Sequence, residues 1–135
     1  MGRPRLEKPG QTPTEIWLAY ISGYLDGDGC FRVNNGSPEV SATNAFPYTL
    51  RQLQAMFGGG ISVEKAKDRC RTIYKWRLYG DAAMDLVHAL RPYLWEKLPQ
   101  AELLIAIRAE SPGAKRDGLI KQLGQLKRID YKKEE

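Results

Sequence analysis

The sequence predicts an α+β domain in which helices cover one face of a curved, four-stranded antiparallel sheet. The expected order is αββαββα, followed by C-terminal helices. Three observations support it. An apolar helix runs into an Asp-Gly-Asp-Gly stop, strands with alternating apolar and polar residues come in pairs, and a helical segment separates the pairs. The 135 residues suffice for one domain with its own core and contain no internal repeat.

The first helix has clear start and stop signals. Thr12 can cap it, Pro13 suits the first helical position, and Glu15 lies three residues after the cap, as in a capping box. Gly27 and Gly29 provide the conformational freedom that the chain needs to leave the helix. Residues 1–11 are rich in Pro, Gly and charge, so we expect a flexible basic tail before a single domain over 12–135.

Two hairpins and the helix between them follow. Residues 30–44 predict two strands with a turn at 34–38, because Phe31 and Val33 alternate with polar neighbours. Residues 48–57 predict a helix that Gly58-Gly59-Gly60 ends. A third strand is expected to start at 61 and a fourth to cover 73–79, where one side carries the apolar residues Tyr74, Trp76 and Leu78 and the other carries Lys75 and Arg77.

The C-terminal part predicts helices. Asp81 can cap one that reaches about Leu90, and Pro92 terminates it. Pro99 opens another helix through about residue 109, and residues 117–132 predict a terminal one. We expect all three tryptophans to pack in the core, namely Trp17, Trp76 and Trp95.

Charge and cysteine content restrict the class of partner. The net charge of +5 and a pI of about 9.3 favour an anionic partner, and basic residues concentrate between Lys65 and Arg77, opposed only by Asp68. Two cysteines without a CxxC motif argue against structural zinc and predict reduced thiols in a cytoplasmic protein. No apolar run reaches membrane-spanning length, so a membrane partner is not expected.

The end of the first helix is a candidate metal site. A carboxylate there faces the negative end of the helix dipole, which is unfavourable unless a cation compensates, so Asp28 is a candidate ligand for a divalent metal. A calcium loop beginning at Asp26 is excluded, because its fifth position would be Cys30 and its twelfth Ser37 rather than a bidentate Glu.

Residues 21–29, Ile-Ser-Gly-Tyr-Leu-Asp-Gly-Asp-Gly, resemble the signature of the LAGLIDADG homing endonucleases. The similarity extends over roughly residues 14 to 110, through the segments Phe57-Gly58-Gly59-Gly60-Ile61, Tyr74-Lys75-Trp76-Arg77-Leu78 and Pro92-Tyr93-Leu94-Trp95-Glu96-Lys97. It implies a Mg²⁺-dependent endonuclease that cuts double-stranded DNA at a specific, near-palindromic site, of the type found in mobile introns and inteins. No small-molecule substrate is expected.

The resemblance also assigns roles. Asp28 and the backbone carbonyl of Gly27 correspond to metal ligands, and Lys97 corresponds to the active-site lysine that stabilises phosphate charge or positions the attacking water. Asp26, two residues earlier, is expected either to cap or to orient the turn. Asn44 follows the second strand, where the family carries a water-ordering Gln or Asn; counting from the turn at residue 57 places Ala42 there instead.

A sheet with helices on one face leaves its other face free for the major groove of DNA, where Arg, Lys and Asn pair with purine edges. Glu39 can accept from a cytosine amine. The register of the third strand is open: either Lys65 and Lys67 or Ser62, Glu64 and Ala66 face the DNA. Arg71 and Arg77 are weaker candidates for a phosphate contact. The predicted DNA-binding residues are Arg32, Asn34, Glu39, Ser41, Lys65, Lys67, Lys75 and Arg77.

Small residues along the first helix predict close approach to another helix. Ala19, Gly23 and Gly27 repeat every four residues with Ser22 beside them. Packing against the domain's own sheet is one interpretation. The resemblance favours the other, a two-fold homodimer that brings two Asp28 carboxylates together.

Two function classes remain from the sequence. The first is the endonuclease; the second is a non-cleaving DNA-binding regulator or an RNA-splicing maturase on the same fold. The presence of both Asp28 and Lys97 favours cleavage, because a pure binder has no need of an acidic group facing phosphate. The expected location is the cytoplasm, or the organelle or nucleoid that holds the host DNA.

Overall fold

The structure, a computed structural model, describes residues 13–65 and 72–126. The expected basic tail over 1–11, the Thr12 cap and Lys67 lie outside these ranges. The elements in chain order are α1 (Pro13–Asp28), β1 (Gly29–Asn34), β2 (Ser37–Asn44), α2 (Tyr48–Phe57), β3 (Gly60–Lys65), β4 (Thr72–Tyr79), α3 (Gly80–Leu90), the 3₁₀ turn η1 (Arg91–Tyr93), α4 (Leu98–Ala109) and α5 (Ala114–Leu126). The predicted αββαββα order with C-terminal helices is confirmed.

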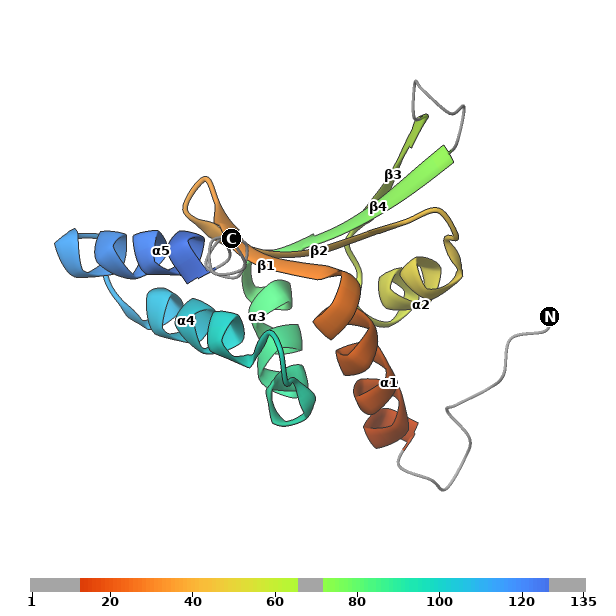
Figure 1. The fold of residues 1–135 in the computed structure, drawn as a ribbon, viewed down its shortest axis with the longest axis horizontal. Helices are drawn as coiled ribbons and strands as arrows, with labels where there is room; N and C mark the ends of the chain where they lie inside the picture. Colours follow the sequence, from red (N-terminus) through yellow and green to blue (C-terminus); the bar gives the residue numbers. More distant parts are fainter. Residues whose placement is uncertain (1–12, 66–71, 127–135) are drawn as a thin grey trace, which may run out of the picture.

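The four strands form one antiparallel sheet in the order β1-β2-β4-β3. Figure 1 shows the curved sheet above α1, α2, α3 and α4, while no described helix covers its upper face. Because the two hairpins join through β2 and β4, the central strands carry partners on both sides and fix the register of the whole sheet. The upper, uncovered face is called the outer face below.

Two local features explain the hairpin and the turn before β3. Asn35 and Gly36 both have positive φ, 54° and 80°, as a two-residue type I′ turn requires. At Gly59, φ is 93° and an added Cβ would lie 2.4 Å from the carbonyl oxygen of Arg77, so only glycine fits. The Trp76 indole N–H donates to the Gly58 carbonyl at 2.9 Å, which fastens this turn to β4.

The core lies between the sheet and the helices below it. Ile21 and Leu25 of α1 pack with Phe31, Val40 and Trp76 of the sheet, all without exposed surface. Burial of such side chains is the main favourable term in folding, about 1.5–3 kcal/mol each. In the described ranges, no helix is long and apolar enough to cross a membrane.

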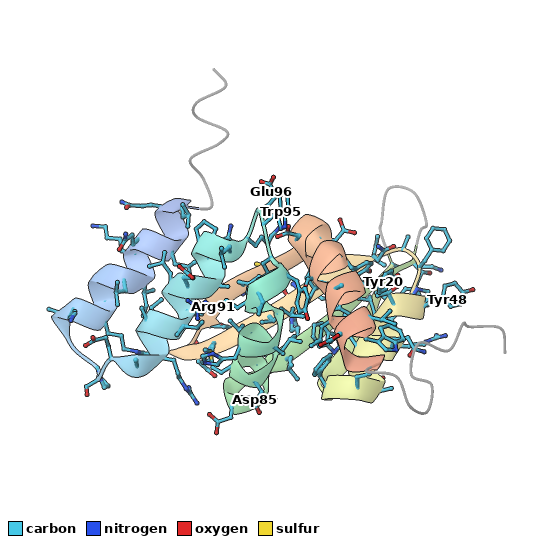
Figure 2. All side chains as sticks on the ribbon, turned by 90° about the horizontal axis from the view of Figure 1, so that it is seen from below. Tyr20, Tyr48, Asp85, Arg91, Trp95 and Glu96 are labelled. Carbon is cyan, nitrogen blue, oxygen red and sulfur yellow. The ribbon has the colours of Figure 1, made fainter. Side chains whose placement is uncertain are left out.

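Trp95 departs from the prediction. Its side chain is 84% exposed, whereas Trp17 and Trp76 are buried as expected. Leu94, the residue before it, takes the interior position and is 4% exposed, so Trp95 is turned outward. Figure 2 shows Trp95 and Glu96 projecting beside one end of α1.

Candidate functional site

The helix α1 ends in an exposed carboxylate. Asp28 is its last residue, and no hydrogen bond or ion pair joins that carboxylate to another residue of the described ranges. The carbonyl end of a helix carries a partial negative charge, so an uncompensated carboxylate there is unfavourable. Asp28 therefore lies where a bound cation would offset both charges.

The other carboxylate of the motif is fully engaged. Asp26 Oδ2 accepts from the backbone N–H groups of Trp95 and Glu96, each at 3.0 Å, and Oδ1 accepts from that of Lys97 at 2.9 Å. These N–H groups belong to the three residues that precede α4, and Lys97, its N-cap residue, forms no side-chain cap hydrogen bond. A carboxylate is favoured near a helix N-terminus, so Asp26 stabilises the segment that leads into α4.

Lys97 completes a reciprocal contact. Its ammonium donates to the backbone carbonyl of Asp26 at 2.6 Å, and the side chain is partly buried. A cation is favoured at the carbonyl end of a helix, so Lys97 stabilises the end of α1 while Asp26 stabilises the segment that leads into α4. The structure thus brings Lys97 to the same helix end as Asp28, as the sequence predicted, and two of its ammonium protons remain for other partners.

The pKa of Asp26 reflects these contacts. Partial burial acts to raise it, but the backbone N–H groups of Lys97, Glu96 and Trp95 and the charge of Lys97 act in the opposite direction and outweigh burial. The pKa of Asp26 consequently lies below its ordinary value, and the carboxylate stays ionised at neutral pH. The sequence predicted that Asp26 caps or orients the turn after α1, whereas the observed contacts of its carboxylate are with the segment before α4.

Asn44, the last residue of β2, lies near α1 on the face of the sheet that the helices cover. Its amide N–H donates to the Tyr24 hydroxyl at 3.2 Å, and its carbonyl oxygen accepts from the Phe46 N–H at 3.0 Å. Burial raises the pKa of Tyr24; the Asn44 hydrogen bond lowers it, and the charge of Asp28 raises it further. These contacts hold the Asn44 amide against α1, and its water-ordering role stays a prediction. Ala42, the alternative, is buried in the core.

The outer face of the sheet is polar. Strand pairing sets Cys30, Ser41, Arg77 and Gly60 in one cross-strand row, and places Arg32 opposite Glu39 in the next. Arg32, Asn34, Lys75 and Arg77 are all partly exposed there, as predicted. A shallow depression beside β3 is lined by Gly60, Ile61, Ser62, Lys75, Arg77 and Tyr79.

Two predicted DNA contacts on this face are corrected. Glu39 has no exposed surface, and its carboxylate is paired with two arginines, so it has no free acceptor edge for a cytosine amine. Ser41 is 4% exposed, because the longer side chains around it cover so short a residue. The alternation of residues along β2 predicts the correct sheet face for Glu39 and Ser41. It does not predict which residues on that face are covered by neighbouring side chains.

The pairing of β3 settles the strand-three register. Ser62 lies opposite Lys75 and shares the outer face with Glu64. Lys65 pairs with Thr72 and lies on the opposite, helix-covered face. The alternative with Lys65 on the outer face is therefore wrong. Glu64 is exposed and forms no ion pair with any residue in the described ranges.

The small-residue stripe of α1 points away from the sheet. Ala19, Gly23 and Gly27 are exposed, and an added Cβ at Gly23 or Gly27 would meet no atom within 4 Å. Packing against the chain's own sheet is thus excluded for these three. Ser22 is a correction: it is fully buried on the other side of the helix, because one residue along a helix turns the side chain by about 100°.

The donor set at the end of α1 fits a divalent cation such as Mg²⁺. Asp28 supplies a hard carboxylate oxygen, and the Gly27 carbonyl lies in the last helical turn, where carbonyls lack intrahelical partners. Among the described residues, no group of three or more His, Cys, Asp and Glu side chains could hold a metal ion. A metal at Asp28 would take its other ligands from water, phosphate or a second chain.

Comparisons with known proteins agree with this geometry. Residues 15–77 match the family model described as a LAGLIDADG-like domain. No curated protein matches the chain. The structure is similar to the homing endonuclease I-CvuI, solved with the I-CreI target in 2 mM Mg with the DNA not cleaved, at 20% identity and a TM-score of 0.69 over 86% of this chain and 85% of that one.

A second structure of I-CvuI, with its own target and 2 mM Ca, matches at 18% identity and a TM-score of 0.69, over the same shares of both chains. The archaeal intron-encoded homing endonuclease I-Vdi141I in complex with DNA matches at 18% identity and a TM-score of 0.66, over 83% of this chain and 84% of that one. The nearly equal shares mean that these chains are of similar length to this one. At such identities the likeness confirms the predicted fold.

Proposed function

We propose that this chain, whose residues 15–77 match a LAGLIDADG-like domain, is a site-specific DNA endonuclease that acts as a homodimer with a divalent metal. One observation carries the proposal. The reciprocal contact between Asp26 and Lys97 holds an ammonium at the same end of α1 as the exposed carboxylate of Asp28. Folding stability explains the contact between Asp26 and Lys97, whereas an uncompensated Asp28 carboxylate adds nothing to that stability.

The chemistry follows from these groups. Hydrolysis of a phosphodiester needs an activated water, neutralisation of phosphate charge and stabilisation of the leaving oxygen. A bound Mg²⁺ supplies Lewis acidity and lowers the pKa of a coordinated water. Asp28 and the Gly27 carbonyl would hold it. Lys97, fixed by one hydrogen bond to Asp26, has two protons left for the phosphate oxygens or the attacking water.

The exposed stripe of α1 supports a homodimer. Three exposed small residues, two of them glycines at which an added Cβ would meet open space, let two copies of the helix approach closely about a two-fold axis. Each copy would contribute one Asp28, so two carboxylates would serve two strands of DNA. A two-fold dimer recognises a near-palindromic target, with each outer sheet face in the major groove of one half-site.

The proposal is tested by selection followed by cleavage. Sequences that the purified chain binds are selected from a randomised duplex pool, and the selected duplex is then incubated with Mg²⁺, Mn²⁺, Ca²⁺ or EDTA. We expect double-strand breaks at one position with Mg²⁺ or Mn²⁺ and none with EDTA. Sedimentation at micromolar concentration should give a dimer. Binding without cleavage under every metal would overturn the endonuclease proposal and favour the non-cleaving DNA-binding alternative.

A further inference from the structure

Three side chains from three strands meet on the outer face. Arg32 of β1 donates through Nε to Glu39 Oε1 of β2 at 3.0 Å, and Arg77 Nε of β4 lies 3.6 Å from Glu39 Oε2. Arg32 and Glu39 are direct cross-strand partners, while Arg77 is one pair further along β2, opposite Ser41. Two guanidinium groups therefore converge on one carboxylate from opposite sides.

Burial within this cluster is uneven. The Glu39 side chain has no exposed surface, whereas those of Arg32 and Arg77 remain 42% and 39% exposed. A buried carboxylate between two cations is compensated, but such an arrangement typically contributes little net stability, because desolvation offsets the attraction. Stability alone thus gives no reason for a charged triad on a sheet face that no described helix covers.

The contact geometry selects which nitrogens are available. Both arginines turn their Nε toward Glu39, and the Nη groups of Arg32 and Arg77 form no hydrogen bond with another residue of the described ranges. A pair of Nη donors matches the O6 and N7 acceptors of guanine in the major groove. The Arg77 contact is the looser one, since neither Arg77 Nε nor Glu39 Oε2 has a hydrogen-bond partner in the described ranges.

We infer that Glu39 is a positioning residue for base recognition, which holds Arg32 and Arg77 so that their Nη groups meet guanines in neighbouring base pairs. Without Glu39, two guanidinium groups this close would repel each other. With it, they stay on one carboxylate, at adjacent cross-strand positions of the sheet. The inference rests on the proposed function, of which it uses only the DNA binding.

The test uses the selected duplex and competition binding. Each base pair of the half-site is replaced in turn, and the loss of affinity is measured for the wild type and for Arg32→Ala, Arg77→Ala and Glu39→Gln. We expect guanine preference at two neighbouring base pairs, of roughly 5- to 150-fold each. Arg32→Ala should remove one preference and Arg77→Ala the other, while Glu39→Gln should weaken both.

The matched control is Asp85→Asn, which removes a negative charge from an exposed position on α3, away from the outer face. It should leave both guanine preferences unchanged, whereas a purely structural Glu39 would lower the affinity of Glu39→Gln for all sequences equally. If Glu39→Gln does not fold, Arg32→Lys replaces it: the charge is kept, but the guanidinium is lost, and guanine preference should fall at one base pair only.

The outcomes separate the two proposals. A wild-type chain that binds no duplex DNA overturns the proposed function and this inference with it. Specific binding without guanine preference at neighbouring base pairs overturns the inference alone. Full wild-type preference in a folded Glu39→Gln or in Arg32→Lys also overturns it. Loss of both preferences in Glu39→Gln, with Asp85→Asn unaffected, supports it whether or not the chain cleaves.

Discussion

Residues close together in α1 have opposite surroundings. Asp26 receives three backbone N–H groups from the segment before α4, whereas Asp28, two residues later, is exposed and unpaired within the described ranges. Ser22 is fully buried, whereas Gly23 is exposed with open space around it. Successive helical residues differ by about 100° in direction, so short spacings along α1 separate residues that stabilise the chain from residues left free to bind.

The largest expected effect concerns Asp28. Replacement by Asn keeps the shape but removes the charge that would hold the metal, so cleavage should fall by at least about 10³-fold, corresponding to several kcal/mol of transition-state stabilisation. Folding stability should stay the same or rise by about 0.3–1 kcal/mol, since the negative end of the helix dipole loses a repulsive charge. Single-turnover cleavage and thermal unfolding measure the two quantities.

The control for this variant is Asp85→Asn on α3, an exposed carboxylate far from the end of α1 in Figure 2. It should cleave at the wild-type rate. Near wild-type cleavage by Asp28→Asn would show that the exposed carboxylate is not a metal ligand.

The next effect concerns dimerisation through the exposed stripe. Gly23→Leu places a branched side chain where two helices would approach most closely, and overpacking costs about 1–3 kcal/mol. The dissociation constant of the dimer should rise roughly 5- to 150-fold. Gly118→Leu on α5 is the matched control, because an added Cβ there also meets open space. Equal sedimentation behaviour for the two variants would rule out α1 as the dimer contact.

Asp26→Asn tests the paired carboxylate of the comparison. Asn retains one acceptor oxygen but replaces the other by an NH₂ group, so at least one of the N–H groups of Trp95, Glu96 and Lys97 loses its partner. We expect a loss of about 1–2 kcal/mol in the free energy of unfolding, measured with urea. Unlike Asp28→Asn, this variant should mainly lose folding stability. Its loss of cleavage activity should be the smaller effect and should come from the displacement of Lys97.

The pH dependence of stability has a defined sign. The pKa of Asp26 is lower in the folded chain than in the unfolded one, so its contribution is complete above the unfolded value of about 3.9 and is lost as the pH falls through the lower, folded value. Between pH 5 and pH 3, the wild type should therefore lose more stability than Asp26→Asn. Parallel urea midpoints for both chains over this range would contradict the role of Asp26 as a charged acceptor for the N–H groups before α4.

Local patterns predicted most of the fold because they reflect local physics. The alternation of Tyr74, Trp76 and Leu78 with Lys75 and Arg77 matches the pleat of β4, and Gly58-Gly59-Gly60 marks the end of α2, as observed. The expected Thr12 cap of α1 and the expected helix end at 132 lie outside the described ranges. The positions of Asp28 and Lys97 at one helix end also agree with the sequence-based prediction.

The errors share another origin. Whether Glu39 reads a base or pairs with Arg32 depends on side chains of neighbouring strands, and no periodicity along one strand encodes that contact. The exposure of Trp95 follows from Leu94, the residue before it, which takes the interior position. Composition favoured the core for an aromatic residue, but it does not tell which of two neighbouring apolar residues the fold buries.

The smallest expected effect separates the two neighbours Ser22 and Gly23. The Ser22 hydroxyl is buried and has no hydrogen-bond partner in the described ranges, so Ser22→Ala removes an unsatisfied polar group and raises helix propensity. The free energy of unfolding should rise by about 0.5–1 kcal/mol, seen as a higher melting temperature. Because Ser22 faces inward, the dissociation constant of the dimer should not change. A weaker dimer in Ser22→Ala would restore Ser22 to the dimer contact that the sequence predicted and would show that α1 rotates on association.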